Sequence, residues 1–271
     1  MSGIAVAQLG EIADLQAGVG FPVDLQGRSS GDYPVAKVGD ISRVGRSGEA
    51  VISAADHYID EGDLARLRAR PIPLGSVLFA KIGEAIRQNH RVIAGCALIV
   101  DNNAMAAIPT SRVESRYLYH FLRTVDFYGL ASATTVPALR KSELERLHVP
   151  LPPLAEQKRI ARILDAADAL RAKRREGLAR LDTLIRSTYL DMFGDSVTNP
   201  MEWEERTLGD LAQGSFRNGL SPSTKGTIDG EVLTLSAITG GRFDFTAKKS
   251  TRFDKSPSPA QRLARILHER S

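Results

Sequence analysis

Basic, amide and hydroxyl side chains gather in several short segments of residues 1–150. These residue types can recognise nucleic acid, because arginine pairs with guanine and asparagine or glutamine with adenine, each through two hydrogen bonds. Serine and threonine hydroxyls more often hold phosphate. The candidates are Arg28, Arg43, Arg46, Lys81, Arg87, Gln88, Asn89, Arg91, Thr134, Thr135, Arg140 and Lys141. Each segment alone also suits a solvated loop, so the interpretation depends on finding several of them in one domain.

The sequence offers no catalytic or metal-binding pattern. Its histidines are scattered, and the single cysteine, Cys96, excludes an internal disulfide and a cysteine metal cluster. Gly18 and Gly20 are not followed by the third glycine and helix of a dinucleotide loop. We therefore expect a protein that is not an enzyme, with no catalytic residue, no metal and no cofactor of its own.

Composition places the chain among globular proteins. It has 271 residues, of which 42% are hydrophobic and 25% charged, which suits roughly two domains. No signal peptide or apolar run of membrane-spanning length occurs, so a soluble cytoplasmic protein with no membrane partner is expected. The net charge is +4, yet basic and acidic residues balance over residues 1–154. A DNA-binding domain this neutral would share its phosphate contacts with a partner.

Residues 1–154 have the pattern of a mixed α/β domain. Short apolar or alternating runs predict strands near residues 33–38, 50–53, 76–81 and 91–100. Helical spacing predicts helices near 61–70 and 114–127. An apolar run at 144–151 closes the domain before Pro152 and Pro153. Most of the candidate residues fall between these runs and are expected in loops, and Lys81 and Arg91 lie at the ends of two runs.

A long helix is predicted over residues 155–194. Apolar or small residues recur in steps of three and four, with Arg174 and Gly177 interrupting the stripe. The predicted pairing residues are Ile160, Ile163, Ala167, Leu170, Leu181 and Leu184. At 1.5 Å per residue, the 39 residues from Ala155 to Phe193 would form a helix about 58 Å long, so its stripe needs another long helix as a partner. The alternative is an ordinary packed helix broken near Gly177.

An internal repeat indicates a second domain. The segment Leu9–Ala13 returns as Leu208–Ala212, and the residues around Val35, Ile41 and Tyr58 have counterparts at similar offsets. The repeat stops near residue 255 and is followed by a divergent basic tail, 256–271. Residues 195–255 are therefore predicted to be the truncated start of a second α/β domain.

The segment Val149–Ile160, which reads VPLPPLAEQKRI, resembles the hallmark of type I restriction-modification specificity subunits. The segments 9–12, 33–41, 75–83 and 203–211 are similar to that family as well. The resemblance implies a target-recognition domain followed by a spacer helix, in a non-catalytic subunit that recognises a split double-stranded DNA sequence. It also implies methyltransferase subunits and a motor-nuclease subunit as partners. S-adenosylmethionine, ATP and Mg would belong to those partner subunits.

The end of the chain departs from the family pattern, in which a complete second recognition domain and a second spacer helix follow. Three outcomes remain open: pairing with a second copy through the long helix, pairing with a separately encoded half-subunit, or an inactive fragment. The alternative function is an interaction protein that binds methyltransferase subunits through its helix without reading DNA. Footprinting would separate the two functions.

Overall fold

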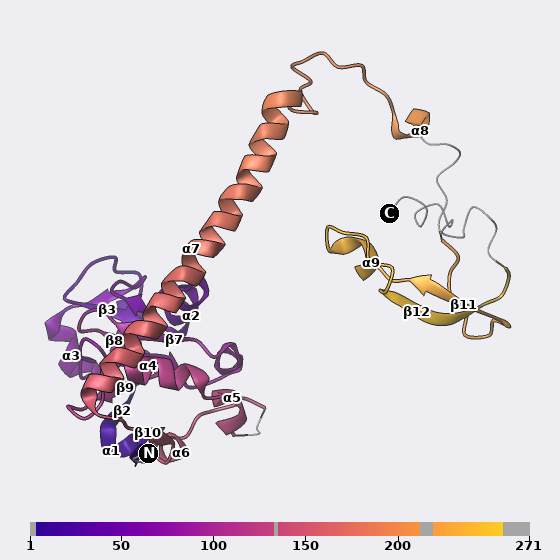
Figure 1. Cartoon of the computed structure of the whole chain (residues 1–271). Helices are drawn as coiled ribbons and strands as arrows, with labels where there is room; N and C mark the ends of the chain where they lie inside the picture. The colour runs from indigo at the N-terminus through magenta and orange to yellow at the C-terminus, as the bar shows by residue number, and fades with distance from the viewer. Residues whose placement is uncertain (1–3, 133–134, 212–218, 257–271) are drawn as a thin grey trace. The chain divides into compact units, whose positions relative to one another are not determined.

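The computed structural model describes residues 4–132, 135–211 and 219–256. The chain divides into two compact units, Met1–Thr188 and Tyr189–Ser271. The first contains an N-terminal α/β domain and most of a long helix (Figure 1). Each unit is described by itself. Within the described ranges no helix is both long and apolar enough to cross a membrane.

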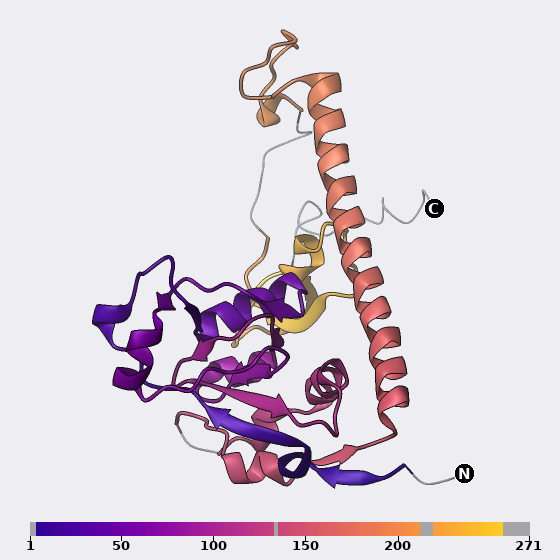
Figure 2. The same cartoon turned by 90° about the vertical axis from the view of Figure 1, so that its left-hand side faces the viewer.

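A five-stranded sheet forms the centre of the N-terminal domain (Figure 2). In sheet order its strands are β2 (Ala13–Ala17), β9 (Ala104–Pro109), β6 (Val77–Ala80), β7 (Arg91–Ala94) and β4 (Val51–Ile52). Neighbours are antiparallel except β4 and β7, which are parallel. The neighbouring inner strands β6 and β7 are buried along their whole length, which is why their sequences are apolar runs rather than alternating ones.

A smaller sheet and several short helices complete the domain. The smaller sheet has the order β5 (Tyr58–Ile59), β3 (Tyr33–Ala36) and β8 (Ile99–Val100). The helices are α1 (Leu9–Ile12), α2 (Val38–Ser47), α3 (Glu61–Leu67), α4 (Ser115–Thr124), α5 (Phe127–Leu130) and α6 (Lys141–Glu145), with short 3-10 turns at Val23–Leu25 and Glu84–Gln88. The predicted mixed α/β class is confirmed. The run 91–100 is two strands rather than one.

Helix α2 was not expected, because glycines at 39 and 45 weaken any helical pattern. Its ends explain why it forms. The Asp40 carboxylate accepts a hydrogen bond from the backbone N–H of Lys37 at 2.9 Å, and Gly48 ends the helix in the left-handed conformation at φ 85°. Ile41 is buried in the core. Arg43 and Arg46 therefore lie on a helix and not in a loop.

The two ends of the N-terminal domain are held together. Strand β1 (Val6–Gln8) pairs antiparallel with β10 (His148–Pro150), which lies within the apolar run predicted at 144–151. The backbone N–H of Leu9 also donates to the carbonyl oxygen of Leu147 at 2.8 Å. The segment that leads into the long helix is thus anchored on the first strand of the domain.

Helix α7 runs unbroken from Leu154 to Phe193, close to the predicted 155–194. The carbonyl oxygen of Pro153 accepts from the N–H groups of Glu156 and Gln157, and Gly194 ends the helix with φ 75°. Gly177 lies within the helix without interrupting it, so the alternative of a break there is wrong. One glycine costs only about 1 kcal/mol relative to alanine, too little to break so long a helix.

The second unit contains a two-stranded ribbon, β11 (Ile228–Leu233) paired antiparallel with β12 (Lys248–Phe253), and the short helices α8 (Leu208–Leu211) and α9 (Ser236–Thr239). The order follows the start of the N-terminal domain. Helix α8 corresponds to α1, and strand, helix and returning strand follow as in β3, α2 and β5. The truncated second domain predicted over 195–255 stays a prediction. The predicted tail lies outside the described residues apart from Ser256.

Candidate nucleic-acid interface

Two of the candidate segments are brought together by backbone pairing. The N–H of Gly83 donates to the carbonyl oxygen of Pro137 at 2.8 Å, and the N–H of Leu139 donates to that of Lys81 at 2.9 Å. The pairing places Lys81 beside the segment that carries Thr135, Arg140 and Lys141. Thr135 and Arg140 are exposed, whereas Lys141 lies on α6, 3.6 Å from the carboxylate of Glu145. Thr134 lies outside the described residues.

Arg87 is presented at the surface by an aromatic support. Its guanidinium lies 4.2 Å from the ring centroid of Tyr128 and donates to the Tyr128 hydroxyl at 2.6 Å. Its Nε atom donates to Glu84 at 3.0 Å, and the side chain remains 62% exposed. Gln88, the next residue, is also exposed. A stacked but accessible guanidinium is oriented in advance for a planar, bidentate partner such as a guanine edge.

The structure contradicts the expectation that Asn89 and Arg91 are free to read bases. Arg91 is 4% exposed, and its guanidinium stacks 3.6 Å from the ring centroid of Phe127. Burial lowers the pKa of Arg91. Asn89 accepts from Arg91 at 2.8 Å and donates to the carbonyl oxygen of Val125 at 3.1 Å. Both side chains are used within the domain, because β7 carries Arg91 into the core where only internal partners are available.

The remaining candidates lie on the α2 and α3 side of the domain and are largely paired with carboxylates. Arg28 contacts Asp63 at 2.8 Å and Asp60 at 3.4 Å. Arg43 contacts Asp56 at 2.9 Å and also pairs with Asp40. Arg46 is exposed on the last turn of α2. The ion pairs lower the positive charge that this side offers to phosphate, which fits the balanced charge of the domain.

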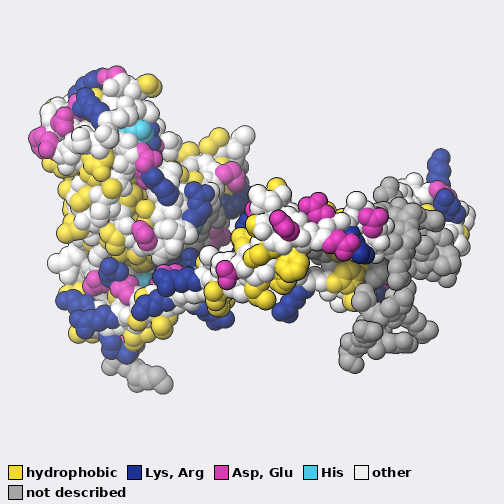
Figure 3. All heavy atoms as spheres, turned by 90° about the horizontal axis from the view of Figure 1, so that it is seen from above, with side chains coloured by type: hydrophobic (Ala, Val, Ile, Leu, Met, Phe, Trp, Pro, Cys, Tyr) yellow, Lys and Arg dark blue, Asp and Glu magenta, His cyan; other side chains and the backbone are white. Residues whose placement is uncertain are grey.

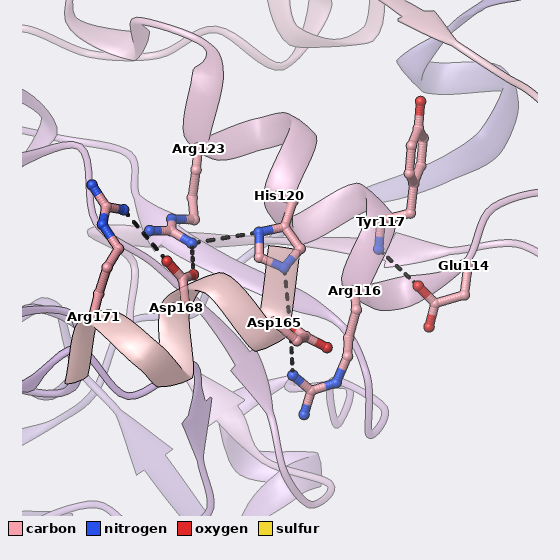
Figure 4. Close-up of polar contacts among 8 residues, drawn as sticks. All are labelled: Glu114, Arg116, Tyr117, His120, Arg123, Asp165, Asp168 and Arg171. Atoms are coloured by element: carbon pink, nitrogen blue, oxygen red, sulfur yellow. Dashed lines mark hydrogen bonds and ion pairs between the residues drawn. The ribbon is translucent and has the colours of Figure 1, made fainter. Parts of the chain in front are cut away.

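A polar junction fixes the long helix on the domain (Figure 4). His120 Nε2 on α4 lies 2.9 Å from Asp165 Oδ1 on α7, and Arg116 reaches the same oxygen at 3.1 Å. One turn further along, Arg123 pairs with Asp168. These contacts lock α4 and α7 side by side. Sequence reasoning missed them, because aspartates on a long helix look like ordinary solvated charges.

Gln157 completes the junction at the start of α7. Its side chain is 1% exposed, and its Oε1 atom accepts from the backbone N–H of Glu114 at 2.8 Å. Its Nε2 atom donates to the carbonyl oxygens of Pro152 at 2.8 Å and Arg112 at 3.2 Å. Both ends of the amide are thus satisfied. The VPLPPLAEQKRI motif, which contains Gln157, was the one sequence signal that this residue joins the start of α7 to the domain.

Helix α7 uses nearly opposite faces for the domain and for the apolar stripe. The residues that face the domain are Gln157, Ala161, Asp165 and Asp168. At about 100° of rotation per residue, this face lies roughly 160° around the helix axis from the predicted stripe. Four stripe residues are strongly exposed: Ile163 at 54%, Leu170 at 67%, Leu181 at 55% and Leu184 at 58%. Figure 3 shows hydrophobic side chains at the surface of the outer part of this helix. Ala167 is exposed as well, and Leu178 and Ile185 widen the stripe.

Ile160 is the exception among the predicted pairing residues. It is partly buried against the main core of the N-terminal domain. Its position near the start of α7 places it where the helix still touches the domain. The exposed stripe therefore begins at Ile163.

Comparison with known proteins assigns the family. The family described as "Type I restriction modification DNA specificity domain" matches residues 1–180. The chain belongs to this family. The matched residues include the α/β domain and most of α7, and the resemblance of the VPLPPLAEQKRI segment is confirmed at the level of the family.

Two curated relatives carry the same description. The putative type I restriction enzyme specificity subunit S.HindORF215P of Haemophilus influenzae is 26% identical over 163 residues, which cover 60% of this chain and 37% of the relative. The type I restriction enzyme MjaIX specificity subunit of Methanocaldococcus jannaschii is 26% identical over 182 residues, 59% of this chain and 41% of the relative. The chain thus spans about two fifths of the length of these type I specificity subunits.

A solved structure shares the fold. A chain from a study of complex assembly and conformational transition in the type I R-M system superposes with a TM-score of 0.52 at 19% sequence identity. The match covers 68% of this chain and 43% of that one. In the parts of our chain that the structure describes, no group of three or more His, Cys, Asp or Glu side chains is placed to hold a metal ion.

Proposed function

We propose that this chain is the DNA-recognition component of a type I restriction-modification complex and that it carries out no catalysis itself. The observation that carries the proposal is the junction between α4 and α7. A domain with exposed base-reading groups is locked by Gln157, Asp165 and Asp168 to a long helix whose apolar stripe faces away from it. A rigid domain and helix of this kind transmit a fixed distance from one DNA half-site to the next.

The base-reading surface consists of the accessible candidates on the paired segments 81–88 and 135–141. These are Lys81, Arg87, Gln88, Thr135, Arg140 and Lys141. The backbone pairing of 81–83 with 137–139 holds their two segments together, and the Tyr128 ring holds Arg87 in place. Arginine and glutamine in this arrangement suit guanine and adenine edges in the major groove.

The exposed stripe of α7 pairs with another long helix. Ile163, Leu170, Leu181 and Leu184 would otherwise present apolar surface to water along one side of the helix. The partner is a second copy of this chain or a second specificity segment. Methyltransferase subunits and a motor-nuclease subunit bind the assembled specificity component. They bring S-adenosylmethionine, ATP and Mg, because the recognition component needs none of these groups.

The test is methylation sequencing of a host that expresses this chain with methyltransferase subunits, compared with the same host lacking the chain. A split motif that depends on the chain supports the proposal. Two identical inverted halves mean that two copies pair through α7, whereas unequal halves mean that a different specificity segment supplies the second helix. If no motif depends on the chain and footprinting of the complex shows no sequence-specific protection, the chain is an interaction protein and the proposal is wrong.

A further inference from the structure

A polar pocket of about 220 Å³ lies where the recognition domain meets α7. The C-terminal end of α2 and the loop after it supply Gly45, Gly48 and Glu49, and α4 supplies Tyr119 and Arg123. His90 precedes β7, while Asp168, Arg171 and Arg175 come from α7. The domain and the helix thus build the pocket together. None of the candidates chosen from the sequence for base reading, apart from the internally bonded Asn89 and Arg91, lines it.

Positive charge exceeds negative charge in this pocket. Arg123 and Arg171 share one carboxylate, that of Asp168, as Figure 4 shows. Arg175 has no ion-pair partner among the residues that the structure describes. Burial, with smaller contributions from the nearby charges of Arg46 and Arg91, lowers the pKa of His90. The site is therefore built to attract an anion.

Two glycines let the basic groups approach the backbone of α2. A Cβ atom on Gly48 would lie 3.0 Å from both terminal nitrogens of Arg175, and one on Gly45 would lie 2.6 Å from the His90 ring. The C-terminal end of α2 carries roughly half a negative charge, which orients the Arg175 guanidinium without neutralising it. Arg175 is thus placed by packing, and its hydrogen-bond donors remain available.

We propose that this pocket binds a phosphate group of the DNA backbone. Guanidinium groups match phosphate oxygens through parallel N–H···O bonds, and Arg171 and Arg175 lie one turn apart on the same side of α7. Because the pocket has walls from both the recognition domain and the helix, a bound phosphate ties the DNA to the spacer helix as well as to the domain. This proposal rests on the proposed function and adds a contact that does not depend on base sequence.

The test measures DNA affinity against salt concentration, using the full chain assembled with its methyltransferase subunits. Two duplexes are needed, one with the target motif and one with both halves scrambled. Arg175→Ala should weaken binding to both duplexes by a similar factor, roughly 3- to 10-fold, and reduce the slope of log affinity against log salt by about 0.9. The affinity of Arg175→Lys should lie between those of the wild type and Arg175→Ala, because lysine keeps the positive charge but loses the two parallel donors of the guanidinium. The matched control is Lys173→Ala, which removes a positive charge two residues away and outside the pocket.

Three results would overturn the assignment. Equal salt slopes for Arg175→Ala and Lys173→Ala would mean that the pocket holds no DNA phosphate. A loss confined to the target duplex would make Arg175 a base reader. If inorganic phosphate raises the thermal stability of the wild type but not of Arg175→Ala while the salt slope stays unchanged, the ligand is free phosphate. Failure of the proposed function looks different, since the wild type would then not distinguish the two duplexes.

Discussion

The imidazole of His120 and the carboxylate of Asp165 meet at 2.9 Å across the boundary between the recognition domain and α7. His120 is 7% exposed, so this contact lies inside the junction and is not a surface pair. Arg116 shares the carboxylate at 3.1 Å. One aspartate on the long helix thus satisfies two donors of α4, and the orientation of the helix depends on it.

Replacing Asp165 should therefore weaken the junction. Asp165→Ala leaves His120 and Arg116 without their common acceptor, and we expect it to lower the free energy of unfolding by about 1–3 kcal/mol. The control is Asp182→Ala, at an exposed position of the same helix, for which a change within about 0.5 kcal/mol is expected. Chemical denaturation of both variants measures the difference. Equal stability of the two variants would contradict a structural role for Asp165.

The junction should also respond to acid. Burial alone would raise the pKa of Asp168, but the hydrogen bond and charge of Arg123, with a further contribution from His120, outweigh it, so its pKa lies below the usual 3.8. A carboxyl group with a depressed pKa in the folded state stabilises above its unfolded pKa, and this contribution is lost as the pH falls through the folded value.

Asp168→Asn tests this linkage. At pH 7 we expect the variant to be less stable than the wild type by about 1 kcal/mol, and at a pH below the folded pKa of Asp168, which itself lies under 3.8, the two should converge because the wild-type carboxyl is then protonated. Urea unfolding at the two pH values provides the measurement. A stability difference that persists unchanged at low pH would show that the ion pair with Arg123 does not contribute.

Arg87 and Asn89, two residues apart in the sequence, should behave differently on mutation. Arg87→Ala removes an exposed group and is expected to relax one position of the methylated motif while the spacer length stays the same. Asn89→Ala removes an internal acceptor of Arg91 and is expected to cost about 1–3 kcal/mol of stability without changing the motif. Methylation sequencing and denaturation of both variants separate the two effects. A changed motif in Asn89→Ala at normal stability would restore it as a base reader.

The contrast between these residues shows what sequence reasoning can and cannot give. Strands β6 and β7 were predictable because burial on both faces leaves an apolar run. The burial of Arg91 was not, since the aromatic ring of Phe127 that stacks on it comes from a segment 36 residues away. Polarity marks a residue as a candidate, but only the tertiary fold decides whether water or DNA can reach it.

The same limit applies to the long helix. Its existence and both ends followed from helix formers, Pro153 and Gly194. Its division into two faces did not, because Asp165 and Asp168 resemble solvated helix charges until α4 is placed beside them. Strand β9 was missed for a related reason: alanines in Ala104–Pro109 have little intrinsic preference for strands and form one only between β2 and β6.

The length of α7 should set the distance between half-sites. Deleting residues 178–184 removes one heptad beyond the junction, so the stripe keeps its register and the contacts of Asp165 and Asp168 with α4 remain. Seven residues shorten the helix by about 10 Å, which corresponds to about 3 base pairs. Methylation sequencing should therefore show the same half-site sequences with a spacer shorter by about that amount. As a control, Gly177→Ala stiffens the same region without changing its length and should leave the spacer unaltered. If the deletion changes the half-site bases, or leaves the spacer as it was, the length of α7 does not set the distance between half-sites. The fixed junction with α4 then serves only to stabilise the fold.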